Sequence, residues 1–145
     1  VVLYQYGLGK ETGSADFFLP NDTRHVSGAL AAEKHLGRQV INVNLISLKD
    51  ILLRLDFARI DLLKMDVEGA EYEIIESPTF REASSVVGQL CIEFHHRWRP
   101  DGKKRTGDAV EVLRELGFRC AWASTATNEE YLFVKQSRPY MTFRK

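Results

Sequence analysis

Two polar runs that follow apolar segments of strand length contain the residue types best able to do chemistry. Asp66-Val67-Glu68-Gly69 closes and follows the apolar run of residues 60–67, and Glu93-Phe94-His95-His96 ends the run of residues 86–94. In open α/β sheets, ligands bind outside the carboxyl ends of the strands. If the two runs form neighbouring strands, their polar ends lie together at one end of the sheet, which we call the mouth.

The first polar run offers carboxylates with more than one interpretation. Strand alternation puts Lys64 and Asp66 on one face, either as a structural ion pair or as a charged group facing a ligand. Glu68 and Glu71 are predicted in the first turn of the next helix, where the helix dipole alone favours acidic side chains. Asp66, Glu68 and Glu71 could bind a divalent cation through oxygen ligands. Nothing in the sequence requires such a cation, and we expect no metal site.

The second polar run offers a candidate proton acceptor. Glu93 and His95 share a strand face, whereas His96 points the other way, so the two histidines are poorly placed to bind one metal. His95 is either a structural histidine or a general base, because the unperturbed pKa of histidine is near 6.5. Arg97 opens a basic, aromatic loop at the same mouth, which is either a substrate contact or a solvated turn.

The elements that position these residues alternate between strands and helices. We expect strands at residues 38–45, 60–67, 86–94, 118–124 and 130–135, and helices that begin at the capping-box pattern of residues 47–50, at residue 68 and at residue 106. This alternation predicts an α/β fold, with a mostly parallel sheet and helices on both faces. The last two strands are joined by too few residues for a parallel crossover, so we expect them to pair antiparallel.

The amino-terminal part of the sequence is less regular. Residues 1–8 and 14–19 are predicted as strands, and residues 22–37 as a short helix or an ordered loop. Residues 7–13 are glycine-rich, but the third glycine is one residue late for a dinucleotide fingerprint and no helix follows. We therefore expect a turn or a hairpin there.

Composition sets broad limits on the class of protein. The 145 residues suit one domain, and 20 basic and 20 acidic side chains cancel, so no overall field favours nucleic acid or an anionic membrane. No apolar run approaches the roughly 18 residues of a membrane span. The two cysteines form neither a disulfide framework nor a zinc motif.

Residues 60–75 resemble the signature of FkbM-type methyltransferases and related methyltransferase-like proteins. These carry a strand that ends in Lys-x-Asp-x-Glu-Gly-x-Glu, and the matching residues here are Lys64, Asp66, Glu68, Gly69 and Glu71. Residues 89–96 resemble the next strand of the methyltransferase-like group, with its Glu-x-His ending. Residues 6–9 resemble the segment after the third strand, so the resemblance covers most of residues 1–135.

The resemblance implies a Rossmann-like class I methyltransferase domain over residues 1–136, followed by a peripheral tail at residues 137–145. It implies methyl transfer from S-adenosylmethionine, most readily to a hydroxyl oxygen of a small-molecule or glycan-like acceptor. In this fold the cofactor is held chiefly by a glycine-rich loop after the first strand. The chain is expected to begin near the third strand, so we expect a fragment that is inactive alone.

The carboxyl-end rule and the chemistry of methyl transfer together suggest roles at the mouth. The expected catalytic residues are Asp66, Glu68 and His95; the cofactor is expected at Asp66 and Val67, and the substrate at Glu71, Glu93, His96 and Arg97. Two other functions stay open: a non-catalytic methyltransferase-like binding protein, and another Rossmann-type enzyme that uses a nucleotide.

Overall fold

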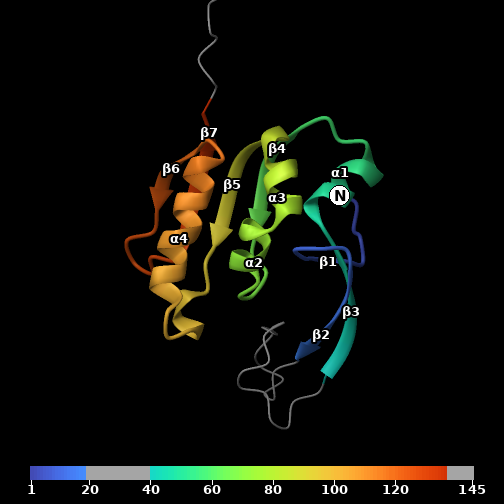
Figure 1. Cartoon of the computed structure of the whole chain (residues 1–145), viewed down its shortest axis with the longest axis horizontal. Coiled ribbons are helices and arrows are strands. Elements are labelled where there is room, and N and C mark those ends of the chain that lie inside the picture. The colour runs from blue at the N-terminus through green and yellow to red at the C-terminus, as the bar shows by residue number, and fades with distance from the viewer. Residues whose placement is uncertain (19–39, 137–145) are drawn as a thin grey trace, which may run out of the picture.

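The computed structural model describes residues 1–18 and 40–136, which form two sheets with helices between and in front of them (Figure 1). The segment predicted as a short helix or loop at residues 22–37 and the tail at residues 137–145 lie outside the described residues. The first sheet has the order β1-β3-β2 and the second the order β4-β5-β7-β6. The chain is therefore an α/β protein with two mixed sheets.

The first sheet is built around its longest strand. β3 (Val40–Ile46) pairs parallel with β1 (Gly7–Leu8) and antiparallel with β2 (Gly13–Phe18). The glycine-rich segment between β1 and β2 is a turn, as one of our two alternatives predicted. A hairpin is excluded, because β1 and β2 lie on opposite sides of β3 and do not pair with each other. The predicted strand over residues 1–8 is confirmed only at its last two residues.

The second sheet contains both strands that end at the predicted mouth. β4 (Ile60–Met65) and β5 (Val87–Glu93) are parallel neighbours, as predicted. β7 (Glu130–Lys135) lies between β5 and β6 (Phe118–Ala123) and runs antiparallel to both. The expected antiparallel pair at the end of the chain is thus confirmed. The expectation of a mostly parallel sheet is not met by the described strands, because β7 reverses the direction next to β5.

The helices gather on one face of the second sheet. α2 (Glu71–Glu76), α3 (Pro78–Ala83) and α4 (Gly102–Glu115) stand in front of it in Figure 1. Short 3-10 turns, η1 (Ser84–Val86) and η2 (His96–Trp98), lie immediately before and shortly after β5. The described residues show no helices on the second face, which corrects the expectation of a sheet covered on both sides.

The core confirms which face is covered. The fully buried side chains come from alternate positions of the strands and from the helix faces opposite them, including Leu90, Ile92, Phe94, Phe133, Tyr72, Phe80, Ala109 and Leu113. On the other face Leu62 is 54% exposed and Trp122 is 56% exposed. β4 is an edge strand with one open face, so our interpretation of residues 60–67 as a buried strand was wrong.

α1 (Leu48–Leu55) joins the two sheets and begins where the capping pattern predicted. Ser47 is its N-cap, and the Ser47 hydroxyl accepts from the backbone N–H of Asp50 at 3.1 Å. The backbone N–H of Ser47 donates to Thr12 at 3.0 Å, so the β2 side of the chain completes the cap. α1 packs on α3, which ties the first sheet to the second.

Candidate functional site

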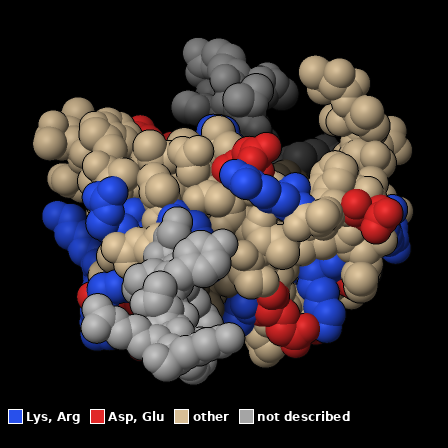
Figure 2. All heavy atoms as spheres, turned by 90° about the horizontal axis from the view of Figure 1, so that it is seen from above, with Lys and Arg blue, Asp and Glu red and all other residues tan. Residues whose placement is uncertain are grey.

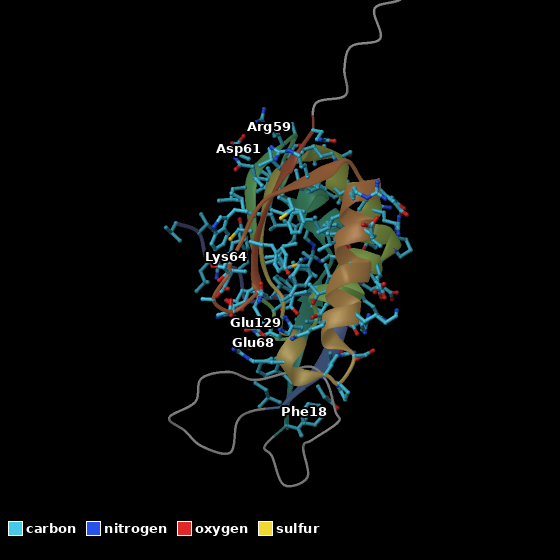
Figure 3. All side chains as sticks on the ribbon, turned by 90° about the vertical axis from the view of Figure 1, so that its left-hand side faces the viewer. Phe18, Arg59, Asp61, Lys64, Glu68 and Glu129 are labelled. Atoms are coloured by element: carbon cyan, nitrogen blue, oxygen red, sulfur yellow. The ribbon has the colours of Figure 1, made fainter. Side chains whose placement is uncertain are left out.

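The polar ends of β4 and β5 meet at the mouth, at one end of the second sheet, as the sequence predicted. Figure 3 shows Glu68 and Glu129 at this end and Arg59 and Asp61 at the opposite end, with Lys64 between them. The parallel register pairs Met65 with Ile92, one residue before Asp66 and Glu93 respectively. Residues that follow the two strands are therefore brought together by the pairing itself.

His95 is the centre of the mouth. Its side chain is 3% exposed, and Nδ1 lies 2.9 Å from Oε1 of Glu71. Nε2 lies 3.3 Å from Oε2 of Glu68 and 3.9 Å from a carboxylate oxygen of both Asp66 and Glu93. Because Oε1 of Glu71 already accepts from two backbone N–H groups, we assign the proton of this contact to Nδ1, and Nε2 faces the other acids.

Glu71 is the residue that orients His95. It is the first residue of α2 and is fully buried, and its Oε1 accepts from the backbone N–H groups of Val67 and Gly69, each at 3.1 Å. Its other oxygen, Oε2, is buried without a hydrogen-bond partner among the described residues. Glu71 therefore stabilises the mouth from the protein interior and is not exposed to a ligand that binds at the surface.

The segment before α2 differs from the prediction. Glu68 has φ 54° and Gly69 has φ 101°, so both adopt left-handed backbone in a turn. Glu68 therefore lies outside the first turn of α2, contrary to our expectation. The turn leads the Glu68 side chain back over the carboxyl end of β4, where it is 29% exposed beside His95. Glycine adopts this backbone without strain, which accounts for Gly69.

The charges at the mouth perturb one another. Burial lowers the pKa of His95, but the hydrogen bond that Nδ1 donates to Glu71 and the charges of Glu71, Glu68 and Glu93 outweigh it, so the pKa is raised. Burial, with the negative charge of Asp66, raises the pKa of Glu93. Asp66 raises the pKa of Lys64 through a hydrogen bond of 3.0 Å.

The predicted pair of Lys64 and Asp66 is confirmed, but it is not buried. The two side chains are 65% and 33% exposed, because the open face of β4 carries both. A surface pair of this kind adds roughly 0–1 kcal/mol to stability. The structural interpretation of the pair is therefore a weak explanation for Asp66.

The remaining predicted residues lie around this cluster. His96 and Arg97 belong to η2, and Arg97 pairs with Oε2 of Glu129 at 2.8 Å. Glu129 is 2% exposed, and its carbonyl accepts from the backbone N–H of Phe94 at 2.8 Å. We did not anticipate Glu129, and its one sequence signal is an acid directly before the last strand. Val67 is half-buried and packs against the core.

A cavity of about 300 Å³ lies beside the mouth, between the first sheet and α2. Its lining from the first sheet side is Gly9, Lys10, Ala15 and Leu45, and from the α2 side it is Gly69, Ala70, Glu73, Ile74 and Arg99. Arg99 is held by Glu73 at 3.2 Å. Gly69 lines the cavity and also donates to Glu71, so the cavity and the acidic cluster share the same turn.

The fold and the mouth together define an α/β protein with titratable groups at the carboxyl ends of adjacent parallel strands. Residues 1–120 match the family model of the methyltransferase FkbM domain, and the chain belongs to this family.

Two curated relatives are similar to this chain. One is the probable methyltransferase-like protein 24 of Rattus norvegicus, which is 31% identical over 93 residues. The other is its Homo sapiens counterpart, which is 32% identical over 93 residues. The matches cover 64% of this chain but only 23% of each relative. No solved structure matches the chain.

The acidity of the mouth is local. Figure 2 shows the molecule from above, at the end opposite the mouth, where acidic side chains lie next to basic ones. At the mouth, by contrast, Asp66, Glu68, Glu71 and Glu93 surround His95, with Lys64 beside Asp66.

Among the described helices, none has the length and apolar character needed to cross a membrane.

Proposed function

We propose that this chain is part of an S-adenosylmethionine-dependent methyltransferase that acts on a hydroxyl oxygen. The observation that carries the proposal is the position of His95: its Nε2 faces Asp66 and Glu68 at the mouth of a domain that belongs to the FkbM family. Transfer of a methyl group to a hydroxyl requires loss of the hydroxyl proton. A histidine held in one orientation by a buried carboxylate suits this task.

The residues of the mouth fit the charge of the cofactor. S-adenosylmethionine carries a sulfonium cation and supplies an electrophilic methyl group when bound. Four carboxylates with Lys64 beside Asp66 favour a cation, and the Asp66 carboxylate is 33% exposed. We propose that Asp66 and Val67 lie against the cofactor. The backbone of Gly69 and the adjoining cavity of about 300 Å³ leave room for a bound molecule there.

The roles of the other residues follow from their contacts. We propose that Nε2 of His95, in its neutral form, accepts the proton of the acceptor hydroxyl, with Glu68 stabilising the imidazolium from 3.3 Å. Glu71 keeps Nδ1 protonated and fixes the ring, so it is a positioning residue. Glu93, His96 and Arg97 are proposed to contact the acceptor, a small molecule or a glycan-like compound.

Substitution of Asp66 tests the proposal. In the full-length protein, Asp66→Asn is expected to lower methyl transfer from S-adenosylmethionine to a panel of polyol and sugar acceptors about 30- to 1000-fold. Because the pair with Lys64 is exposed, the melting temperature should change little. The matched control is Asp61→Asn, whose side chain is 84% exposed at the opposite end of the sheet. Near-normal turnover of folded Asp66→Asn would refute the catalytic role.

We also propose that the 145 residues alone bind S-adenosylmethionine weakly and are inactive. The sequence contains no glycine-rich loop that runs into a helix, and the matched region spans 23% of the curated relatives. Isothermal titration of the chain beside the full-length protein measures the difference. Micromolar binding by the chain alone would show that the residues described above suffice.

The wider fold is part of the same proposal. β4 and β1 are edge strands of their sheets among the described residues, each with one side unpaired. We propose that in the whole protein further strands join these edges into one mostly parallel, Rossmann-like sheet. An experimental structure of the full-length protein with both edges left open would contradict this.

A further inference from the structure

The mouth holds three side chains whose metal-ligating atoms lie near one another. Asp66, Glu68 and His95 have ligand atoms that all lie within 4.8 Å of one another. Nε2 of His95 is 3.3 Å from Glu68 and 3.9 Å from Asp66. The sequence offers Asp66, Glu68 and Glu71 as oxygen ligands without requiring a cation, but the structure turns Glu71 toward Nδ1 of His95 and puts Nε2 of His95 in its place.

The spacing suits a small divalent cation. Bonds of about 2.0–2.2 Å from a metal to nitrogen and oxygen ligands place two ligand atoms at most about 4.4 Å apart. The two nitrogen-to-oxygen distances of 3.3 and 3.9 Å lie inside this limit, and the two carboxylate oxygens lie within 4.8 Å of each other, so binding would draw these exposed groups closer by a few tenths of an ångström at most. The carboxylates are 33% and 29% exposed, so a cation can reach them from solvent and keep further positions for water or a substrate.

The support behind His95 is a second and separate indication of a metal ligand. Histidines that bind metals almost always donate their other ring N–H to a carboxylate, a carbonyl or water, which fixes the ring and raises the basicity of the ligating nitrogen. Here Nδ1 donates to Glu71, which is fully buried and held by two backbone N–H groups. Oε2 of Glu71 remains buried without a hydrogen bond among the described residues.

The balance of charge points the same way. Four carboxylates, those of Asp66, Glu68, Glu71 and Glu93, lie within 3.9 Å of a ring nitrogen of His95. The cation bonded to this cluster is Lys64, which is 65% exposed and screened by solvent. With Nε2 bound to a metal the histidine is neutral, so Lys64 leaves three of the four negative charges without compensation, and a divalent cation offsets two of them.

We propose that Asp66, Glu68 and His95 bind a divalent first-row transition-metal cation at the mouth. One imidazole and two carboxylates favour Mn²⁺ or Zn²⁺ over Mg²⁺ and Ca²⁺, which take oxygen ligands. This inference does not depend on the proposed function, but it replaces one step of it, because Nε2 of His95 cannot bind a metal and accept a proton at the same time. With the cation bound, Nε2 is a ligand, and a hydroxyl that joins the metal loses its proton more readily. Direct proton transfer to His95 then belongs to the metal-free protein.

The test measures metal binding without cofactor or acceptor. Full-length protein is stripped with a chelator and titrated with MnCl₂, followed by electron paramagnetic resonance, and with ZnCl₂, followed by calorimetry. We expect one equivalent of metal in the wild type and in the control Asp61→Asn. Glu68→Gln keeps the shape of a partly exposed side chain and should weaken binding at least about 10-fold.

A second variant tests whether Glu71 orients a metal-binding histidine or only stabilises the fold. Glu71→Gln should keep the stoichiometry but weaken binding about 10- to 100-fold, as expected for a partner behind a ligating histidine. No binding by the wild type at millimolar metal, or equal binding by wild type and Glu68→Gln, would overturn the site. Either result leaves the Asp66→Asn turnover experiment unaffected, so failure of the metal site and failure of the methyltransferase proposal are distinguishable.

Discussion

Replacing Glu71 with alanine removes one oxygen atom that accepts three hydrogen bonds at the mouth. The donors are the backbone N–H groups of Val67 and Gly69, both at 3.1 Å, and Nδ1 of His95 at 2.9 Å. Loss of one partner from a buried charged network costs about 3–5 kcal/mol, because the remaining groups are left buried and unpaired. Glutamine retains a carbonyl oxygen, so Glu71→Gln should cost only about 1–2 kcal/mol.

Thermal and urea unfolding measure both variants. For a domain of about this size, 1 kcal/mol shifts the melting temperature by about 2–4 °C, so alanine should lower it by about 6–20 °C and glutamine by about 2–8 °C. Glu111→Ala is the control, since this side chain is 60% exposed and pairs with Arg114 on the surface of α4; it should change stability by less than about 0.5 kcal/mol. An alanine variant that melts within 2 °C of the wild type would refute the reasoning.

Two further pairs of variants test the packing behind the mouth. A Cβ at Gly102 would lie 1.9 Å from the carbonyl oxygen of His96, so Gly102→Ala should destabilise the folded protein by about 1–3 kcal/mol. Gly107 lies in open space on the same helix, so Gly107→Ala should stabilise the folded protein by roughly 0.5–1 kcal/mol. The Thr106 hydroxyl donates to the Gly102 carbonyl at 3.0 Å and accepts from the Tyr72 hydroxyl at 3.1 Å. Urea unfolding should show that Thr106→Val, which strands the buried Tyr72 hydroxyl, costs about 1–3 kcal/mol, and that Tyr72→Phe costs about 0.5–1.5 kcal/mol; the reverse order would contradict this hydrogen-bond direction.

The sequence alone predicted that the two polar runs lie close together, because this depends on the local pattern of strands and helices. Two apolar runs linked by a helix form adjacent parallel strands, and their carboxyl ends must then meet. This alone brings Asp66 and His95 together. The start of α1 was equally local, since the Ser47 hydroxyl caps a helix through a residue three positions away.

The environment of each side chain could not be predicted in the same way, because burial depends on what covers a strand. The composition of residues 60–67 indicates a buried strand, yet β4 is an edge strand with Leu62 and Lys64 exposed. Glu71 was expected either to be favoured by the helix dipole or to contact the substrate, but the turn at Glu68 and Gly69 directs its carboxylate inward, where it is fully buried. Nothing in the linear pattern distinguishes a left-handed residue at Glu68 from the first residue of the helix.

The stability of the mouth and its chemistry depend on the same atom. Oε1 of Glu71 closes the turn that carries Glu68 and also fixes the ring of His95, so the two groups that face a ligand are positioned by one acceptor. The turn at Gly69 lines the neighbouring cavity as well, which links the shape of the cavity to that acceptor. A change at Glu71 should therefore alter folding, the orientation of His95 and binding of a cation together. A change at Glu68, which is partly exposed and makes no comparable backbone bonds among those described, should alter binding and leave folding nearly unchanged.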